Sequence, residues 1–275
     1  MNMLISRIKQ RALAIFCTLT IALSFAATLL PLPTEVIPVV MVFIPTLIAI
    51  CLTALSEGKT GVRLLLSKLR QWRISIKWVI IALALALAVR LTMSLIALGL
   101  GIISTIQLRP GGPASYILLA VIFFIFAIPE ELGWRGYALP KLLEQRSPLA
   151  AGLIVGVLWG SLHLALLLPG MMNEGAPLLA TLLALVGGSV LFTWLYVNNN
   201  GNIILTTLFH AAQSFFVIVN EGITPEQQMW LLATVYLAAA LIVAMVTGPR
   251  LTRKSVDGRT PVAKAPRAEQ PLARE

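Results

Sequence analysis

The chain has 275 residues, of which 58% are hydrophobic and only 12% are charged. Soluble domains carry about 25% charged residues, so this composition excludes both an ordinary soluble domain and a disordered chain. The net charge of +10 could suggest nucleic acid, but Lys and Arg lie between apolar runs rather than on one soluble face. Two cysteines in apolar runs, Cys17 and Cys51, exclude a disulfide scaffold and a CxxC site. We therefore expect a polytopic membrane protein, with membrane lipid and not nucleic acid as its surroundings.

Eight apolar windows are each long enough, at about 20 residues, to cross a bilayer core. They cover residues 12–33, 36–55, 76–104, 114–138, 149–169, 176–197, 202–220 and 229–247. None alternates with a period of two, so helices rather than barrel strands are expected. The predicted fold class is all-α, a polytopic membrane bundle of about eight transmembrane helices.

Lys and Arg gather on one side of these spans: before the first, after the second and fourth, and after the last. The opposite loops hold a single cation, Arg109, and mainly glutamates. The positive-inside rule then predicts a plasma (inner) membrane protein with both termini in the cytoplasm. Residues 1–33 could instead be a cleaved signal peptide, but the apolar run is long for one, so a retained helix is favoured.

We expect three parts along the chain. Residues 1–113 form an N-terminal three-helix membrane region with a basic cytoplasmic segment at 56–75, and residues 114–247 form the membrane core. The basic segment mixes apolar residues and cations, as in an amphipathic helix on the inner membrane surface, although an ordinary loop fits equally well. Residues 248–275 are rich in Pro and cations without hydrophobic period, which predicts a disordered cytoplasmic tail.

Ionisable groups inside the spans are costly, so each is a functional hypothesis. The set is short and contains both histidines of the protein: Arg90, Glu130, Glu131, Arg135, His163 and His210. Arg90 has no acidic partner in its own span. It could pair with either glutamate or lie near a helix end, and the sequence leaves this open.

The adjacent carboxylates are expected to have different environments. Glu131 and Arg135 are four residues apart on one helix face and can form an ion pair. Glu130 points about 100° away and stays free to exchange protons, as expected of a general base. The alternative is a pair of interfacial glutamates with Arg135 reaching toward the cytoplasm.

Two further helices carry the histidines. Gly152, Gly156 and Gly160 recur every fourth residue, which allows another helix to approach closely and places His163 against it rather than against lipid. Alone, His163 could be a packing histidine bonded to a carbonyl. In the later span, His210 shares a helix side with two polar residues, and all these groups are reachable from one membrane face.

The patterns Glu-Glu-x-x-x-Arg (130–135), aromatic-x-x-x-His (159–163) and His-x-x-x-polar (210–214) resemble the CPBP, or Abi, family of CAAX-protease and bacteriocin-processing intramembrane enzymes. The resemblance covers roughly residues 114–220. It implies that Glu130 activates water with His163 as its partner, and that His210 and position 214 stabilise the oxyanion. The residues expected to support this site are Glu131, Arg135, Trp159 and Gln213.

Two positions depart from the family pattern. Trp159 replaces the usual Phe, which keeps an aromatic wall, and Ser214 replaces the usual Asn or Asp. Gln213, one position earlier, could supply the missing amide.

The resemblance predicts an intramembrane endopeptidase, open to the cytoplasmic side, whose substrate is a prenylated CAAX protein or an unprenylated peptide or membrane protein. Glu130, His163 and His210 could alternatively hold a divalent metal such as zinc. The family has been described both as metalloproteases and as metal-independent glutamate proteases, so the cofactor stays open, as does the oligomeric state.

Two rival functions remain from other classes. One is a small proton-coupled transporter with a Glu–Arg–His relay, although no inverted repeat is visible in the sequence. The other is a non-catalytic CPBP-like membrane protein with a bacteriocin-immunity or interaction role, for which Ser214 is the best support.

Overall fold

The computed structural model describes residues 2–107, 110–216 and 222–252, and its fold is all-helical, as the sequence predicts. The predicted tail lies almost wholly outside these residues, as do Arg109 and Glu221. The α-helices are α1 (Asn2–Ala27), α2 (Ile37–Ser67), α3 (Ile76–Gly99), α4 (Pro113–Gly133), α5 (Leu139–Leu143), α6 (Pro148–His163), α7 (Leu178–Val197), α8 (Ile203–Phe215) and α9 (Pro225–Thr247). Short 3₁₀ turns follow α2 (Lys68–Arg70) and α6 (Leu164–Leu167), and a π-helix, Trp134–Ala138, joins α4 to α5.

Every predicted span corresponds to a helix, which confirms the polytopic bundle. Among the described residues, six helical stretches are long and apolar enough to cross a membrane: Ile37–Arg70, Ile76–Gly99, Pro113–Leu143, Pro148–Leu167, Leu178–Val197 and Pro225–Thr247. The other two predicted spans contain shorter apolar helices, Arg11–Ala27 and Ile203–Phe215. The second of these begins sharply because the Asn202 side chain accepts the N–H groups of Ile204 and Leu205.

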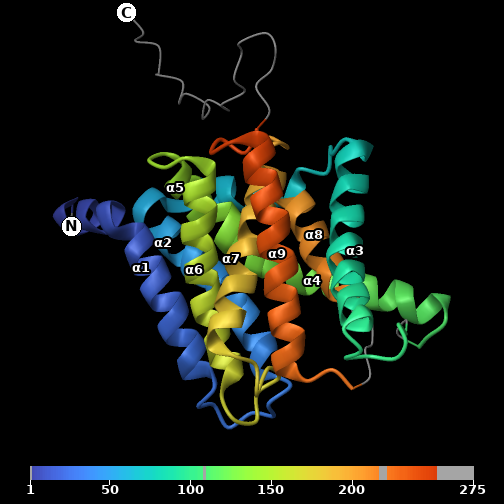
Figure 1. Ribbon diagram of the computed structural model, residues 1–275. Coiled ribbons are helices and arrows are strands. Elements are labelled where there is room, and N and C mark those ends of the chain that lie inside the picture. Colours follow the sequence, from blue (N-terminus) through green and yellow to red (C-terminus); the bar gives the residue numbers. More distant parts are fainter. Residues whose placement is uncertain (1, 108–109, 217–221, 253–275) are drawn as a thin grey trace, which may run out of the picture.

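α4 and α8 pack on each other, and the first half of α4 extends at the side of the bundle (Figure 1). α2 and α3 flank this pair, through α4 and α8 respectively, and α1 packs on α2. α7 lies between α6 and α9 in Figure 1 and contacts both extensively. The three segments with the predicted functional residues, on α4, α6 and α8, therefore meet inside the bundle.

The glycine stripe of α6 faces α7. A Cβ atom at Gly156 would lie 2.6 Å from the Cα atom of Val186, closer than any side chain could be accommodated without movement. Added Cβ atoms at Gly152 and Gly160 would likewise lie 2.8 and 3.0 Å from side chains of α7. The expected close helix approach is present, and its partner is α7.

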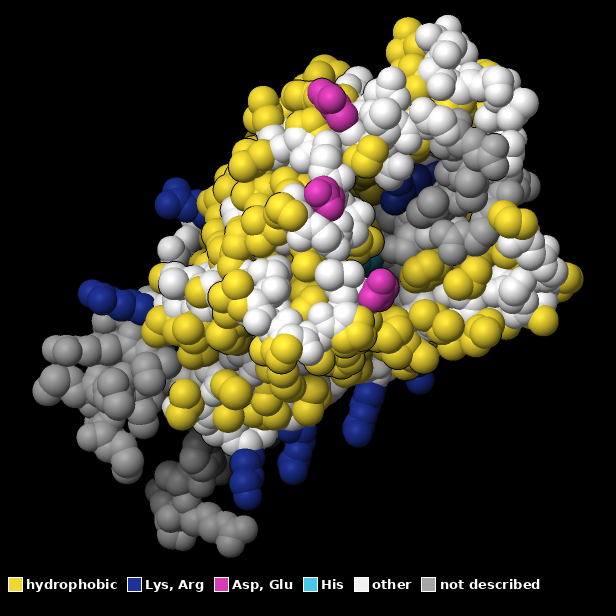
Figure 2. All heavy atoms as spheres, turned by 90° about the horizontal axis from the view of Figure 1, so that it is seen from below, with side chains coloured by type: hydrophobic (Ala, Val, Ile, Leu, Met, Phe, Trp, Pro, Cys, Tyr) yellow, Lys and Arg dark blue, Asp and Glu magenta, His cyan; other side chains and the backbone are white. Residues whose placement is uncertain are grey.

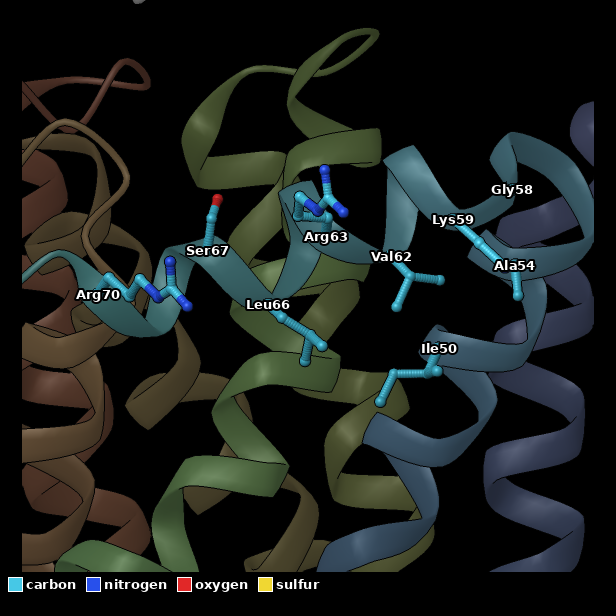
Figure 3. Close-up of a pocket in the computed structure, with 9 residues that line it drawn as sticks. All are labelled: Ile50, Ala54, Gly58, Lys59, Val62, Arg63, Leu66, Ser67 and Arg70. Atoms are coloured by element: carbon cyan, nitrogen blue, oxygen red, sulfur yellow. The ribbon is translucent and has the colours of Figure 1, made fainter.

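The basic segment after the second span is helical. α2 bends at Gly58, whose φ of +67° suits glycine, and continues to Ser67 in a new direction (Figure 3). The 3₁₀ turn ends at Arg70, and residues 71–75 form no helix. That this helix lies on the inner membrane surface remains a prediction.

Arg90 of α3 does not pair with either glutamate. Its Nε atom donates to the backbone carbonyl of Gln213 at 3.0 Å, near the C-terminal end of α8. A cation is favourable there because the last carbonyls of a helix lack partners within the helix. Arg90 therefore ties α3 to α8 and is not part of the carboxylate site.

Candidate active site

Glu131 and Arg135 form the ion pair that their spacing predicts. The Nη1 atom of Arg135 lies 2.9 Å from Oε1 of Glu131, and both side chains are completely buried. The guanidinium also stacks between two aromatic rings, 4.4 Å from the ring centre of Trp159 and 4.1 Å from that of Phe192. Arg135 lies within the π-helix, a widened turn that is frequent at functional sites.

Glu130 faces a different set of groups from α6 and α8. The indole Nε1–H of Trp159 donates to its Oε1 atom. The Nε2 atom of His163 lies 4.0 Å from the same oxygen, and Nε2 of His210 lies 3.9 Å from Oε2. The structure thus brings Glu130 and both histidines together, at the end of α4 where only 5% of Glu130 is exposed.

Each histidine is held by its other ring nitrogen. Nδ1 of His163 lies 2.8 Å from the backbone carbonyl of Trp159, and Nδ1 of His210 lies 3.0 Å from Oε1 of Glu131. Since a carbonyl and an ion-paired carboxylate only accept, each Nδ1 is the donor. The Nε2 atoms that face Glu130 are then acceptors in the neutral rings, and any added proton would go to Nε2.

The space between Glu130 and the imidazoles suits a bridging molecule. Separations of 3.9 and 4.0 Å exceed the 2.7–3.2 Å of a direct hydrogen bond. A water that bonds to both sides would close such gaps. A carboxylate and two oriented imidazoles around one small space can position a water and exchange its protons.

The histidines are partly accessible, whereas the ion pair is not. The side chains of His163 and His210 are 20% and 18% exposed. Figure 2, which shows the lower face of the molecule, has a hollow with a histidine side chain at its bottom. The site is therefore in contact with the surroundings of the bundle.

This hollow lies at the end of the bundle that carries the loops 28–36 and 168–177, opposite the basic segment (Figures 1 and 2). The resemblance predicts an opening on the cytoplasmic side, where the cations are expected. His163 is the last residue of α6, so it lies at the helix end farthest from the predicted cytoplasmic start at Pro148. The hollow accordingly opens at the end of the bundle away from the basic segment, and the side of the membrane on which it opens stays a prediction.

The two polar residues after His210 differ in their surroundings. Ser214 is half-buried in the last turn of α8, and it makes no hydrogen bond within the described ranges. Gln213 is 5% exposed, and neither its side-chain oxygen nor its side-chain nitrogen has a partner there. Both remain candidates for a contact with a bound substrate.

The distances between Glu130, His163 and His210 test whether these residues could hold a zinc ion. In a tetrahedral zinc site with bonds near 2.0 Å, neighbouring ligand atoms are roughly 3.3 Å apart. Here the imidazoles lie 3.9 and 4.0 Å from two different oxygens of Glu130. No three His, Cys, Asp or Glu residues in the described parts of the chain are grouped to hold an ion. The residues as they lie do not fit the metal.

Sequence reasoning missed three contributions to the site. The Trp159 indole is a donor to Glu130 and not only an aromatic wall, His210 binds Glu131, and Phe192 of α7 covers Arg135. The departure from Phe at position 159 was a usable signal, because only Trp adds an N–H. Phe192 gives no chemical signal in the sequence.

A membrane helix bundle with a buried carboxylate between two imidazoles defines an intramembrane site. Residues 112–216 match the family model of type II CAAX prenyl endopeptidase Rce1-like proteins. The chain is also 28% identical over 155 residues to CAAX prenyl protease 2 of Methanococcus maripaludis, a match of 52% of this chain and 56% of that protein. It thus spans about half the length of this curated relative. Both comparisons support the predicted resemblance of residues 114–220 to the CPBP family.

Proposed function

We propose that the protein is an intramembrane endopeptidase in which Glu130 is the general base. One observation carries this proposal: of two adjacent buried carboxylates, only Glu130 faces both imidazole Nε2 atoms across a gap that a water can fill. Glu131 is bound by Arg135 and His210, so its carboxylate is not available to take a proton from a water.

In the proposed first step, a water between Glu130 and His163 attacks the carbonyl carbon of the scissile peptide bond. Glu130 takes one proton of the water as its oxygen bonds to carbon, and the carbonyl oxygen becomes an oxyanion. A His210 ring that is protonated at Nε2 would donate to that oxyanion, and Ser214, one turn later, would supply a second donor.

In the second step the tetrahedral intermediate collapses. The carbon–nitrogen bond breaks, and the proton on Glu130 passes to the leaving amine. The products are a new carboxyl group and a new amino group, and Glu130 returns to its starting state. Glu131 and Arg135 act in this scheme by holding His210 in orientation, so they are positioning residues.

We propose a membrane-associated protein with a C-terminal, prenylated CAAX sequence as the substrate. Support comes from the description of the matching family model and from the printed name of the relative. Two peptides of identical sequence, with and without a farnesyl group, test this point. Equal cleavage of both would support an unprenylated substrate instead.

The test of the activity is peptide cleavage by purified protein, comparing wild type with Glu130→Gln. Gln keeps the size of the side chain but cannot accept the proton, so the rate should fall by about 10²–10⁴-fold. A parallel sample treated with a zinc chelator separates the two mechanisms, because a glutamate protease keeps its activity. Full activity of Glu130→Gln would refute the proposed base.

We also propose an orientation with both termini in the cytoplasm of the plasma membrane, on the distribution of Lys and Arg. A reporter enzyme that works only in the cytoplasm should be active when it is fused after Thr247. Activity of a reporter that works only outside the cytoplasm would contradict this orientation.

A further inference from the structure

A cavity of about 730 Å³ lies outside the active site, in the angle where α2 bends (Figure 3). Its volume is in the range of about 300–1,000 Å³ that is typical of small-molecule sites. The residues that line it all come from α2 and the 3₁₀ turn after it: Ile50, Ala54, Gly58, Lys59, Val62, Arg63, Leu66, Ser67 and Arg70.

The cavity has an apolar part and a basic part. Val62 and Leu66 point from the segment after the bend toward Ile50 on the segment before it (Figure 3). Lys59 and Arg70 lie at the two ends of the later segment, with Arg63 between them. The cavity therefore has an apolar floor, formed by Ile50, Val62 and Leu66. It also has a cation row, formed by Lys59, Arg63 and Arg70.

These cations have no acidic partner among the residues that the structure describes. Within the described part of the chain, neither Lys59, Arg63 nor Arg70 forms an ion pair, although the neighbouring Lys141 lies 3.9 Å from Glu57. Lys68, in the same turn as Arg70, is used differently, because it donates to the Gly136 carbonyl of the π-helix. Lys59, Arg63 and Arg70 can therefore bind an anion that comes from outside the protein.

Leucines of α2 on both sides of the bend are exposed on the outer surface of the bundle. Leu47 and Leu55 on the earlier part of α2 are 57% and 59% exposed, and Leu64 on the later part is 58% exposed. In a membrane protein such side chains contact acyl chains. An occupant that entered from lipid would place an apolar chain against Ile50, Val62 and Leu66 and a charged group beside the cations.

We propose that this cavity binds one anionic phospholipid, with an acyl chain on Ile50, Val62 and Leu66 and its phosphate on the cation row. The charge complementarity selects an anionic headgroup, because clusters of Lys and Arg beside a membrane helix attract anionic lipids. The apolar lining, on a helix that also exposes leucines, selects a lipid over a free phosphate or a soluble acidic peptide. The proposal is independent of the proposed protease activity.

The experiment is native mass spectrometry of the full chain in detergent, titrated with phosphatidylglycerol or phosphatidylcholine. Wild type should bind one phosphatidylglycerol more tightly than phosphatidylcholine. The triple variant Lys59→Gln, Arg63→Gln, Arg70→Gln should lose about a hundredfold in affinity for phosphatidylglycerol, since each such cation contributes roughly fivefold. The matched control, Arg73→Gln, Lys77→Gln, Arg146→Gln, removes the same charge from exposed residues outside the cavity and should stay within about threefold of wild type.

A second variant keeps the charges and fills the apolar part. Ala54→Trp should abolish the tight phosphatidylglycerol complex while the cation row remains, and it covers the case in which the triple variant does not fold. Equal loss in the control triple would overturn the proposal, as would unchanged binding in Ala54→Trp. Displacement of the lipid by millimolar inorganic phosphate would also overturn it, because the site would then recognise phosphate alone.

Discussion

Glu130 and Glu131 are neighbours in the chain, yet they belong to two regions of opposite character. Glu131 is completely buried, paired with Arg135 at 2.9 Å and bonded to His210, and its partner Arg135 lies over the ring of Phe192. Glu130 accepts a hydrogen bond from Trp159 and faces two imidazoles that are partly exposed. The comparison teaches that one helix turn can carry both the scaffold of a site and its reactive group, because adjacent residues point about 100° apart.

The ion pair region should give the largest effect on stability. Arg135→Met leaves the carboxylate of Glu131 buried without its counter-charge, which costs about 3–5 kcal/mol of unfolding free energy. The measurement is denaturation of the purified protein in detergent. The double variant Glu131→Leu, Arg135→Met removes both charges and should recover much of that loss. Equal instability of the single and double variants would mean that the guanidinium acts through its aromatic contacts instead.

The Glu130 region should respond in activity rather than in stability. Trp159→Phe keeps the ring but removes the N–H that binds Glu130, so kcat/KM should fall by about tenfold, as for a lost hydrogen bond to a charged group. The melting temperature should change little. A loss of stability with unchanged activity per folded molecule would show that the indole N–H serves packing only.

The smallest effect is expected at the end of α8. Ser214→Asn places an amide where relatives of this family usually have Asn or Asp, so cleavage should stay equal or rise by a few fold if Ser214 is a weak oxyanion donor. The measurement is the rate of peptide cleavage at saturating substrate. A drop of tenfold or more would show that the hydroxyl itself is needed.

The sequence predicts contacts within a helix far better than contacts between helices. The Glu131–Arg135 pair follows from a four-residue spacing, and the close approach at Gly156 follows from a four-residue repeat. Both depend only on helical geometry, which apolar length and composition make clear in a membrane protein.

Contacts between different helices depend on how the bundle packs, and the sequence does not predict them. The sequence allows Arg90 to pair with a glutamate, but it donates to the Gln213 carbonyl instead. His210 binds Glu131 and also faces Glu130. The π-helix after Gly133 adds a residue to the turn, so facing residues shift in a way that a regular period does not predict. The bend at Gly58 had an equally weak signal, since glycine is also common in straight membrane helices.

The central claim is that Glu130 is reactive and Glu131 structural, and one paired measurement tests it. Glu130→Gln and Glu131→Gln are purified side by side, and peptide cleavage and unfolding free energy are measured on the same samples. The account predicts that Glu130→Gln folds like wild type and loses about 10²–10⁴-fold in rate, whereas Glu131→Gln loses folded yield and stability. A well-folded, inactive Glu131→Gln beside an active Glu130→Gln would contradict it.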